Sequence, residues 1–542
     1  MNIPAALPDP GPGLRRDTVA WPKAPARMRA RSVVAAVTCA LLATACTIGP
    51  RYVAPAAPSV DRYTAGPAPQ HTVTSAGASQ RFDYGARLNA QWWTLFRSPA
   101  LDALLRASLQ HNPTLDAAQA TLRQAQATLE ADAGLFYPQV TGQLGTQRER
   151  FSGATFGGSV PPRLFTLYTG SLNVTYYPDF FGANRLVYRQ QKAQVDYQQF
   201  QLQAAYLTLE ANVVSQGITA AELTEEIRTT RAIIAAEAQL LTLTENRYRL
   251  GAAPYLDVLN QRNQLATSRA ALPPLEQRLA QTRHQLAILA GEYPAQWKEP
   301  DWTDGEIRLP RDLPVSLPST LVQQRPDIRA AEAQMRAANA QVGIDSAKMY
   351  PILALTGSFG QQSGLPQAFF NSGGNVWSLA AGLTQPLFQG GTLRAQRRAA
   401  QAAYEATAAE YRKTVLGAFA QVADALRAVQ HDAEALHAQQ QALQTAREAL
   451  DLAKAQYTDG AIDYLTLLTT QVSYHNASIL VLQTQAHRLR DTAALFAAVG
   501  GGWWSEQPTP PGSAPAAAAR TVTEPTAKTT IAPASAANRR TP

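Results

Sequence analysis

The sequence predicts a mainly α-helical fold with a small β portion that contributes four strands to a barrel wall, the whole arrangement being duplicated within the chain. Three observations support this prediction. Two very long runs lack proline, four shorter segments alternate apolar with polar residues, and the two halves of the chain resemble each other. Long helices, paired strands and a repeated order of elements are therefore expected.

The duplication is visible as gapless similarity between the halves. Residues 112–138 lie on residues 325–351 with ten identities, among them Pro113/Pro326 and the pair Tyr137-Pro138/Tyr350-Pro351. Two further pairs match at almost the same offset: 177–182 with 385–390, and 248–259 with 457–468. Duplication of one unit, not a solenoid, explains this spacing. The first structural repeat is expected at 101–300 and the second at 301–504.

The strands are expected on either side of two Gly/Ser/Pro-rich loops, 151–163 and 361–375. Period-two alternation gives each strand one apolar and one polar face. Each strand would have roughly ten residues, which is the length of a transmembrane β-strand. Because open sheet edges are not tolerated in lipid, several copies would have to share one barrel. Alternation alone equally allows two soluble hairpins on a helical domain.

The longest helices are expected at 182–250 and 391–457, where proline is absent. Each would span roughly 100 Å at 1.5 Å per residue. Partner helices at about 101–136 and 254–291 would together be similarly long. Leu436, Leu443 and Leu450 fall one heptad apart, with alanine at many neighbouring positions, and this pattern favours close helix packing. A coiled coil, an extended stalk and the wall of a tube all fit such helices.

The N-terminal region has the features of an export signal. Residues 28–45 combine two arginines, an apolar core and small residues, which is typical of a secretory signal peptide. Residues 1–27 are expected to precede the true start codon. The sequence before Cys46 is similar to a bacterial lipoprotein box, so Cys46 is expected to be acylated, making 46–100 a lipid-anchored segment. Ordinary cleavage after Ala45, without a lipid, is the alternative. No later segment is apolar enough to be a transmembrane helix.

Composition argues against several other classes. The formal charge is +8, but residues 1–45 hold six basic residues and two aspartates, so +4 remains, spread along the chain. Nucleic-acid binding is therefore not expected. The seven histidines are dispersed, and there is no catalytic constellation, metal motif or phosphate loop. We expect no enzymatic activity and no cofactor apart from the acyl lipid on Cys46. Residues 505–542, rich in Ala, Pro and Thr, are expected to be disordered.

Four segments stand out in order along the chain: QWWTLFRSPALDALLRASLQHNP (91–113), RPDIRAAEAQMRAANAQVG (325–343), PLFQGG (386–391) and AVGGGW (498–503). Together they resemble the outer-membrane factor family, the channel lipoproteins of tripartite efflux pumps in Gram-negative bacteria. The resemblance covers about 46–504 and implies a homotrimer with a twelve-stranded outer-membrane barrel and a long periplasmic helical tube. It implies partners as well, a periplasmic adaptor and an inner-membrane transporter, and gated passive export of small molecules such as drugs.

The resemblance also implies a function for the two glycine turns. In this family they lie at the periplasmic tips of the helical hairpins, where the channel narrows to a gate and the adaptor docks. The residues expected at the turns and docking site are Gly251, Gly460 and Tyr248; those expected at the gate are Tyr457, Asp459, Asp463, Leu465 and Asp257. Relatives often form charged locks at two positions that here are Thr458 and Thr469. The aspartates have an alternative role as helix caps.

Two other classes of protein are alternatives to the channel. A periplasmic coiled-coil adaptor should contain a single helical hairpin flanked by β-rich halves. A surface stalk or adhesin should lack paired strands with an apolar face and should show longer uninterrupted heptads. Two hairpins and an internal duplication fit neither class well.

Overall fold

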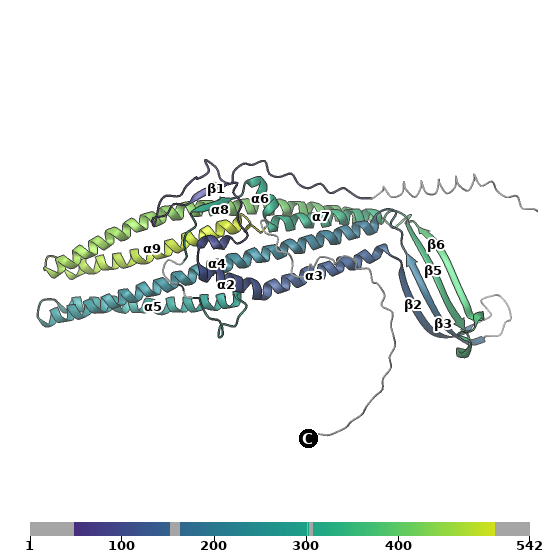
Figure 1. Cartoon of the computed structure of the whole chain (residues 1–542), viewed down its shortest axis with the longest axis horizontal. Coiled ribbons are helices and arrows are strands. Elements are labelled where there is room, and N and C mark those ends of the chain that lie inside the picture. The colour runs from purple at the N-terminus through teal and green to yellow at the C-terminus, as the bar shows by residue number, and fades with distance from the viewer. Residues whose placement is uncertain (1–47, 152–162, 301, 303–306, 504–542) are drawn as a thin grey trace, which may run out of the picture.

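The computed structural model describes residues 48–151, 163–300, 302 and 307–503. The protein is elongated, with a bundle of long helices that carries a curved sheet at one end and two helical hairpin tips at the other (Figure 1). The residues expected to form the upstream extension, the signal peptide and the C-terminal tail, and Cys46 itself, lie outside the described residues.

Two pairs of helices form most of the bundle. Helices α4 (Ala183–Arg249) and α8 (Thr392–Thr458) have 67 residues each, and α5 (Tyr255–Leu289) and α9 (Tyr464–Ala498) have 35 each. The two long proline-free runs are thus helical as predicted, and each spans roughly 100 Å. Each begins after a glycine with positive φ, Gly182 at 81° and Gly391 at 85°. None of the described helices has an apolar stretch long enough to cross a membrane.

The helix expected at about 101–136 is divided in two. Helix α2 (Pro99–His111) and helix α3 (Pro113–Ala133) meet at Asn112, whose backbone is extended with ψ of 119°. A residue before proline avoids the helical region for steric reasons, so Pro113 starts a new helix. The Asn112 side chain caps that helix by accepting from the Thr114 N–H at 2.9 Å. In the second half, α6 (Pro318–Gln324) and α7 (Pro326–Ala347) are separated in the same way.

The four predicted strands form one antiparallel sheet. They are β2 (Gln139–Phe151), β3 (Arg163–Tyr176), β5 (Ile352–Ser363) and β6 (Asn375–Thr384), in the order β2-β3-β5-β6. Strands β2 and β6 are therefore the edges. A second small sheet pairs β1 (Arg81–Tyr84) in parallel with β4 (Asp312–Val315). These two four-residue strands were not predicted from the sequence.

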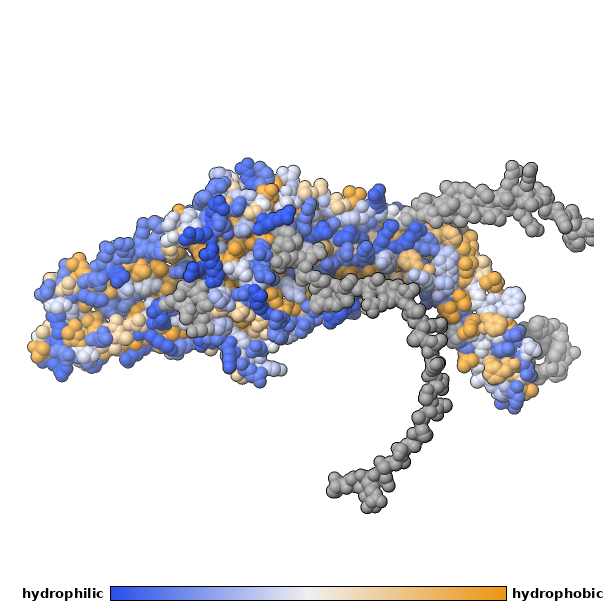
Figure 2. Space-filling model, in the orientation of Figure 1, coloured by the Kyte–Doolittle hydropathy of each residue, from blue (hydrophilic) through white to orange (hydrophobic). Residues whose placement is uncertain are grey.

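The register of the large sheet gathers apolar side chains on one face. Leu172 lies opposite Phe359, which in turn lies opposite Trp377. The opposite face carries the polar partners, such as Ser171, Thr356 and Ser378. We call the face with Leu172 and Trp377 the apolar face of the sheet; Leu144, Leu379 and Leu383 also belong to it and are exposed. Hydrophobic surface accordingly gathers over the strands in Figure 2. The predicted two-faced pattern is confirmed.

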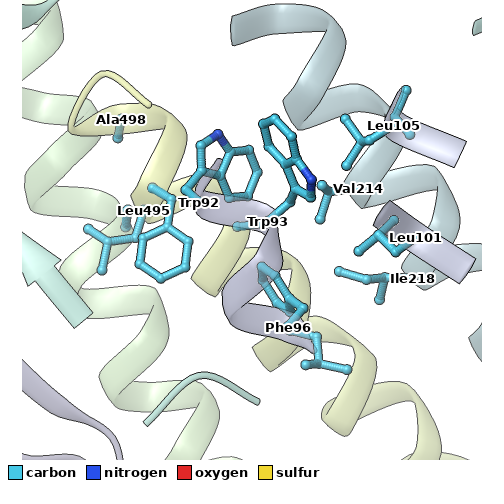
Figure 3. Close-up of a cluster of buried hydrophobic side chains, with 14 of the residues drawn as sticks. Trp92, Trp93, Phe96, Leu101, Leu105, Val214, Ile218, Leu495 and Ala498 are labelled. Carbon is cyan, nitrogen blue, oxygen red and sulfur yellow. The ribbon is translucent and has the colours of Figure 1, made fainter. Parts of the chain in front are cut away.

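The largest hydrophobic core among the described residues includes residues near the middle of α4 and α8, and Figure 3 shows part of it. A short 3-10 helix, Trp92–Phe96, places Trp92 and Phe96 among buried residues of α2, α4 and α9. The Trp92 indole N–H donates to Glu210 Oε2 at 2.9 Å, and its ring lies 5.8 Å from that of Phe496. Trp92 and Trp93 are therefore packing residues of this core.

Candidate gate at the helix tips

The two hairpin turns have the same backbone geometry. Gly251 (φ 75°) and Gly460 (φ 76°) both follow a helix in the left-handed conformation. Around Gly251, the Ala252 N–H donates to Arg247 O at 2.8 Å; around Gly460, the Ala461 N–H donates to Gln456 O at 2.8 Å. These are Schellman-type helix ends, which favour glycine because a side chain is strained at positive φ. A Cβ at either glycine would meet no atom within 4 Å, so the constraint lies in the backbone alone.

Tyr457 is the best-packed residue of the predicted gate. Only 6 % of its surface is exposed, and it belongs to a small cluster with Leu450, Ala453, Tyr464 and Leu467. Its ring lies 6.0 Å from that of Tyr464 at 67°. Burial raises the pKa of Tyr457. Its hydroxyl oxygen is buried and has no hydrogen-bond partner within the described part of the chain.

Arg247 joins the two hairpins at their tips, although the sequence analysis did not identify it. Its guanidinium carbon lies 4.4 Å from the centre of the Tyr457 ring. One guanidinium N–H also donates to the Tyr457 backbone oxygen at 3.2 Å. The first contact is a cation–π interaction and the second caps the end of α8. A contact across 210 residues leaves no local sequence signal.

The aspartates of the predicted gate differ in their environments. Asp463 is the N-cap of α9 and accepts from the Thr466 N–H at 2.9 Å, and that hydrogen bonding lowers its pKa. Burial raises the pKa of Asp257, and the charge of Asp463 raises it further, whereas Arg247 opposes both effects. The capping alternative therefore describes Asp463. Asp459 lies exposed at the end of α8.

The remaining predicted residues are exposed in the single chain. Leu465 is 61 % and Tyr248 45 % exposed, and the Tyr248 ring lies 5.2 Å from that of Tyr255. The hydroxyls of Thr458 and Thr469 each donate at 2.8 Å to a carbonyl of their own helix, Lys454 O and Leu465 O. Each of these two hydroxyls is therefore hydrogen-bonded within its own helix.

A second set of polar residues that the sequence analysis missed lies above the tips. We call it the polar cluster: Glu237 on α4, Gln261, Gln264 and Ser268 on α5, and His475 on α9. The Glu237 carboxyl is fully buried and accepts from Gln264 at 3.1 Å and from Ser268 at 3.0 Å, while His475 Nδ1 lies 3.4 Å away. The Tyr464 hydroxyl donates to Gln261 Oε1, so the cluster extends to the tip.

Comparison with known proteins agrees with this architecture. The family model described as outer membrane efflux protein matches residues 104–292 and 317–501. The pyoverdine export outer membrane protein OpmQ of Pseudomonas aeruginosa is 32 % identical over 80 % of this chain and 93 % of its own. SilC of Salmonella typhimurium, a probable outer membrane lipoprotein, is 27 % identical over 85 % of this chain and 96 % of its own.

Solved structures show the same fold. The outer-membrane channel OprN is 27 % identical, with a TM-score of 0.76 over 84 % of this chain and all of that chain. The outer membrane protein VceC of Vibrio cholerae is 27 % identical, with a TM-score of 0.71 over 77 % of this chain and 99 % of that chain. The adaptor alternative required a single hairpin, and the stalk alternative required the absence of paired strands with an apolar face; the structure contradicts both. The chain belongs to the outer membrane efflux protein family and is an efflux channel of the Gram-negative outer membrane.

Proposed function

We propose that three copies of the chain form one continuous channel, with a twelve-stranded barrel in the outer membrane and a helical tube in the periplasm. The main support for this proposal is that a single chain leaves unpaired surfaces on both sides, at the edges of its sheet and at the outer helices. In the sheet, β2 and β6 are unpaired edges. Among the helices, α4 packs against both α3 and α7, and α7 packs against α8. The first turns of α8 are almost entirely exposed, so α3 of a second copy would cover them.

The turns that lead from the sheet into the helices support a head-to-tail arrangement. Before α4, the Phe181 ring packs 5.4 Å from the ring of Tyr350 in the other half. Before α8, Leu387 and Phe388 are 92 % and 90 % exposed, and Tyr137, the counterpart of Tyr350, is 69 % exposed. A neighbouring copy would bring Tyr137 close to Phe388. Head-to-tail contacts of this kind close into a ring when the rotation per copy divides 360° evenly.

The internal duplication supports the same assembly. Helices of 67 and 35 residues follow each strand pair in both halves. If the halves arose by duplication, three chains give six similar units around one axis. Each copy would then place two glycine turns at the tip of the tube, Gly251 and Gly460. We propose that a periplasmic adaptor docks there, with Tyr248 in its contact surface.

The gate in this proposal lies at the same tip. Leu465 would narrow the pore, since apolar constrictions close by dewetting, and Asp257, Asp459 and Asp463 would favour cations at the mouth. Tyr457 would hold the hairpins closed through its packing and through its contact with Arg247. Small molecules supplied by an inner-membrane transporter would pass through the opened gate without energy input from this chain. An acyl lipid on Cys46 would anchor the N-terminal segment.

Electron microscopy of the protein extracted from outer membranes tests the assembly. Threefold particles with a tube roughly 100 Å long are expected, because each of the two long helices has 67 residues. A monomeric or merely rod-like particle would overturn the channel architecture. Restoration of drug export in cells that lack their own channel tests the activity, with a Leu465→Asp variant as a probe of the constriction.

A further inference from the structure

Two arginines stand on the apolar face of the sheet, near the end farthest from the helices. Side chains alternate along β2, so Arg148 and Arg150 project from the same face as Leu144. Their sequence neighbours Gln147 and Glu149 project from the other face, where Gln147 Nε2 lies 3.4 Å from Glu149 Oε2. Both arginines are exposed, and within the described ranges of the chain neither guanidinium has an ion pair or a hydrogen bond.

The depth of these arginines follows from strand geometry. Arg148 is eight residues beyond Val140, the first apolar residue of this face on β2. Eight residues at about 3.4 Å, on a strand tilted by about 40°, rise roughly 20 Å along the barrel axis. The apolar band of such barrels is about 25 Å tall. Arg148 and Arg150 therefore lie near its far border, where lipid head groups begin and where a charge on the lipid face costs little.

An apolar recess lies directly below the arginines. The connection between β5 and β6 folds back over β3, and a Cβ at Gly170 would come within 2.8 Å of the Phe369 ring. The Phe369 and Phe370 rings are 5.1 Å apart and perpendicular, and Phe370 is 88 % exposed. With Leu144 and Tyr168 they line a cavity of about 470 Å³. Tyr168 is two residues from Thr166, the residue opposite Arg148, and therefore projects from the same face of β3. Aromatic residues commonly occupy this border.

We propose that Arg148 and Arg150 bind the phosphate groups of an outer-leaflet lipid whose acyl chain lies in the recess beside Phe369. Charge complementarity identifies the occupant, because two unpaired guanidiniums match phosphate and the recess below them matches a hydrocarbon chain. In a Gram-negative outer membrane the phosphorylated lipid of the outer leaflet is lipopolysaccharide. The inference rests on the proposed function, since the barrel must turn this face toward lipid.

The test uses the full-length protein purified in detergent and titrated with bis-phosphorylated lipid A in native mass spectrometry. Arg148→Gln with Arg150→Gln should weaken binding about 30-fold, from the typical contribution of two basic residues at a lipid surface. Arg269→Gln, which removes an equal charge from an exposed position on α5, should leave binding unchanged. Phe369→Ala should weaken binding of lipid A and should leave the preference for the phosphorylated form intact.

Three results would overturn the inference. The double variant could bind lipid A as tightly as the wild type, or the wild type could bind lipid A equally well with and without its phosphates. Inorganic phosphate could also displace lipid A from the wild type as effectively as lipid A itself. The last would make the arginines a site for free phosphate. The oligomeric state and the ion conductance of the particles distinguish a failure of the proposed channel from a failure of the proposed lipid site. If wild-type particles are not trimeric, the proposed function fails; if they are trimeric and conduct while the double variant binds lipid A normally, only the lipid site fails.

Discussion

Arg247 provides the sharpest test of how the two hairpins are held together at the tip. Its side chain extends from α4 to α8 and contacts the ring and the backbone oxygen of Tyr457. Replacing it with alanine removes both contacts and also removes the positive charge that lowers the pKa of Asp257. The pKa of Asp257 should then rise, because the negative charge of Asp463 is no longer opposed by Arg247.

The size of the effect follows from these contacts. A cation–π contact at a partly exposed site contributes about 1 kcal/mol. A hydrogen bond from a charged donor adds about 1 kcal/mol once discounted for solvent exposure. The closed arrangement of each copy should therefore lose about 2 kcal/mol, which shifts its closed-to-open ratio about 30-fold. Arg247→Lys should have a smaller effect, because an ammonium keeps the charge and loses the planar stacking surface.

Single-channel recording in planar bilayers measures this shift as more frequent and longer openings of Arg247→Ala. Arg249→Ala is the matched control, because Arg249 is exposed and its side chain donates to Asn246 on its own helix. The reasoning is refuted if the two alanine variants open equally often. An Arg247→Ala channel that opens no more than wild type, with normal folding, would show that packing of Tyr457 alone holds the hairpins.

Four further outcomes are expected. Asp463→Ala should alter cation preference more than opening and should also lose the α9 cap, about 1 kcal/mol, whereas Asp463→Asn should keep the cap and lose only the charge; unchanged ion selectivity of both in a planar bilayer would refute a role at the mouth. Phe388→Asp should impair trimer assembly in size-exclusion chromatography, and a normal trimer would contradict the proposed packing between copies. Burial raises the pKa of Glu210 to about 8, so the protonated form favours folding and stability should fall as pH rises from about 4.5 to about 8; Glu210→Gln should flatten this slope in thermal melts, and an equal slope would contradict the argument. Cys46→Ser should abolish incorporation of radiolabelled palmitate, and persistent labelling would place the acyl group elsewhere.

The helices and the large sheet could be predicted because local signals determine them. Absence of proline over nearly 70 residues leaves α4 no point at which to break, and strict alternation reveals the two faces of β5 and β6. The break at Asn112 was also visible locally, since proline follows it, and the sequence analysis gave that signal too little weight. The helix expected at 254–291 continues through Pro273 and Pro274 in α5, so a proline pair does not always end a helix.

The contacts that connect the hairpins could not be predicted, because they join residues far apart in the chain. Arg488 shows the difficulty: it is 1 % exposed, and its guanidinium donates to Gln80 Oε1 at 3.0 Å across 408 residues. It fixes the N-terminal segment across α9, yet in sequence it is one of two closely spaced arginines on that helix, Arg488 and Arg490, and no local pattern marks it as buried. Strand β1 is similar, since four residues that pair in parallel with β4 carry too short a pattern to be recognised.

Polar pairs between α4 and α9 explain how alanine-rich helices keep a unique alignment. Small residues pack almost equally well when one helix slides by a turn past the other, so packing alone specifies the register weakly. We call the contact between α4 and α9 the seam; polar groups meet at three levels along it. Arg490 donates to Glu222, and Gln483 donates to Glu226 at 3.1 Å. At the third level, His475 lies 3.4 Å from Glu237. Sliding by one turn would break all three contacts at once, and the buried Glu226 carboxyl would lose its Gln483 donor, at a cost of several kcal/mol in total. The register of the seam in turn places Tyr464 against Gln261 and Tyr457 beneath Arg247. The geometry of the tip is therefore set by the whole length of the α4–α9 contact, and not by the turn residues alone.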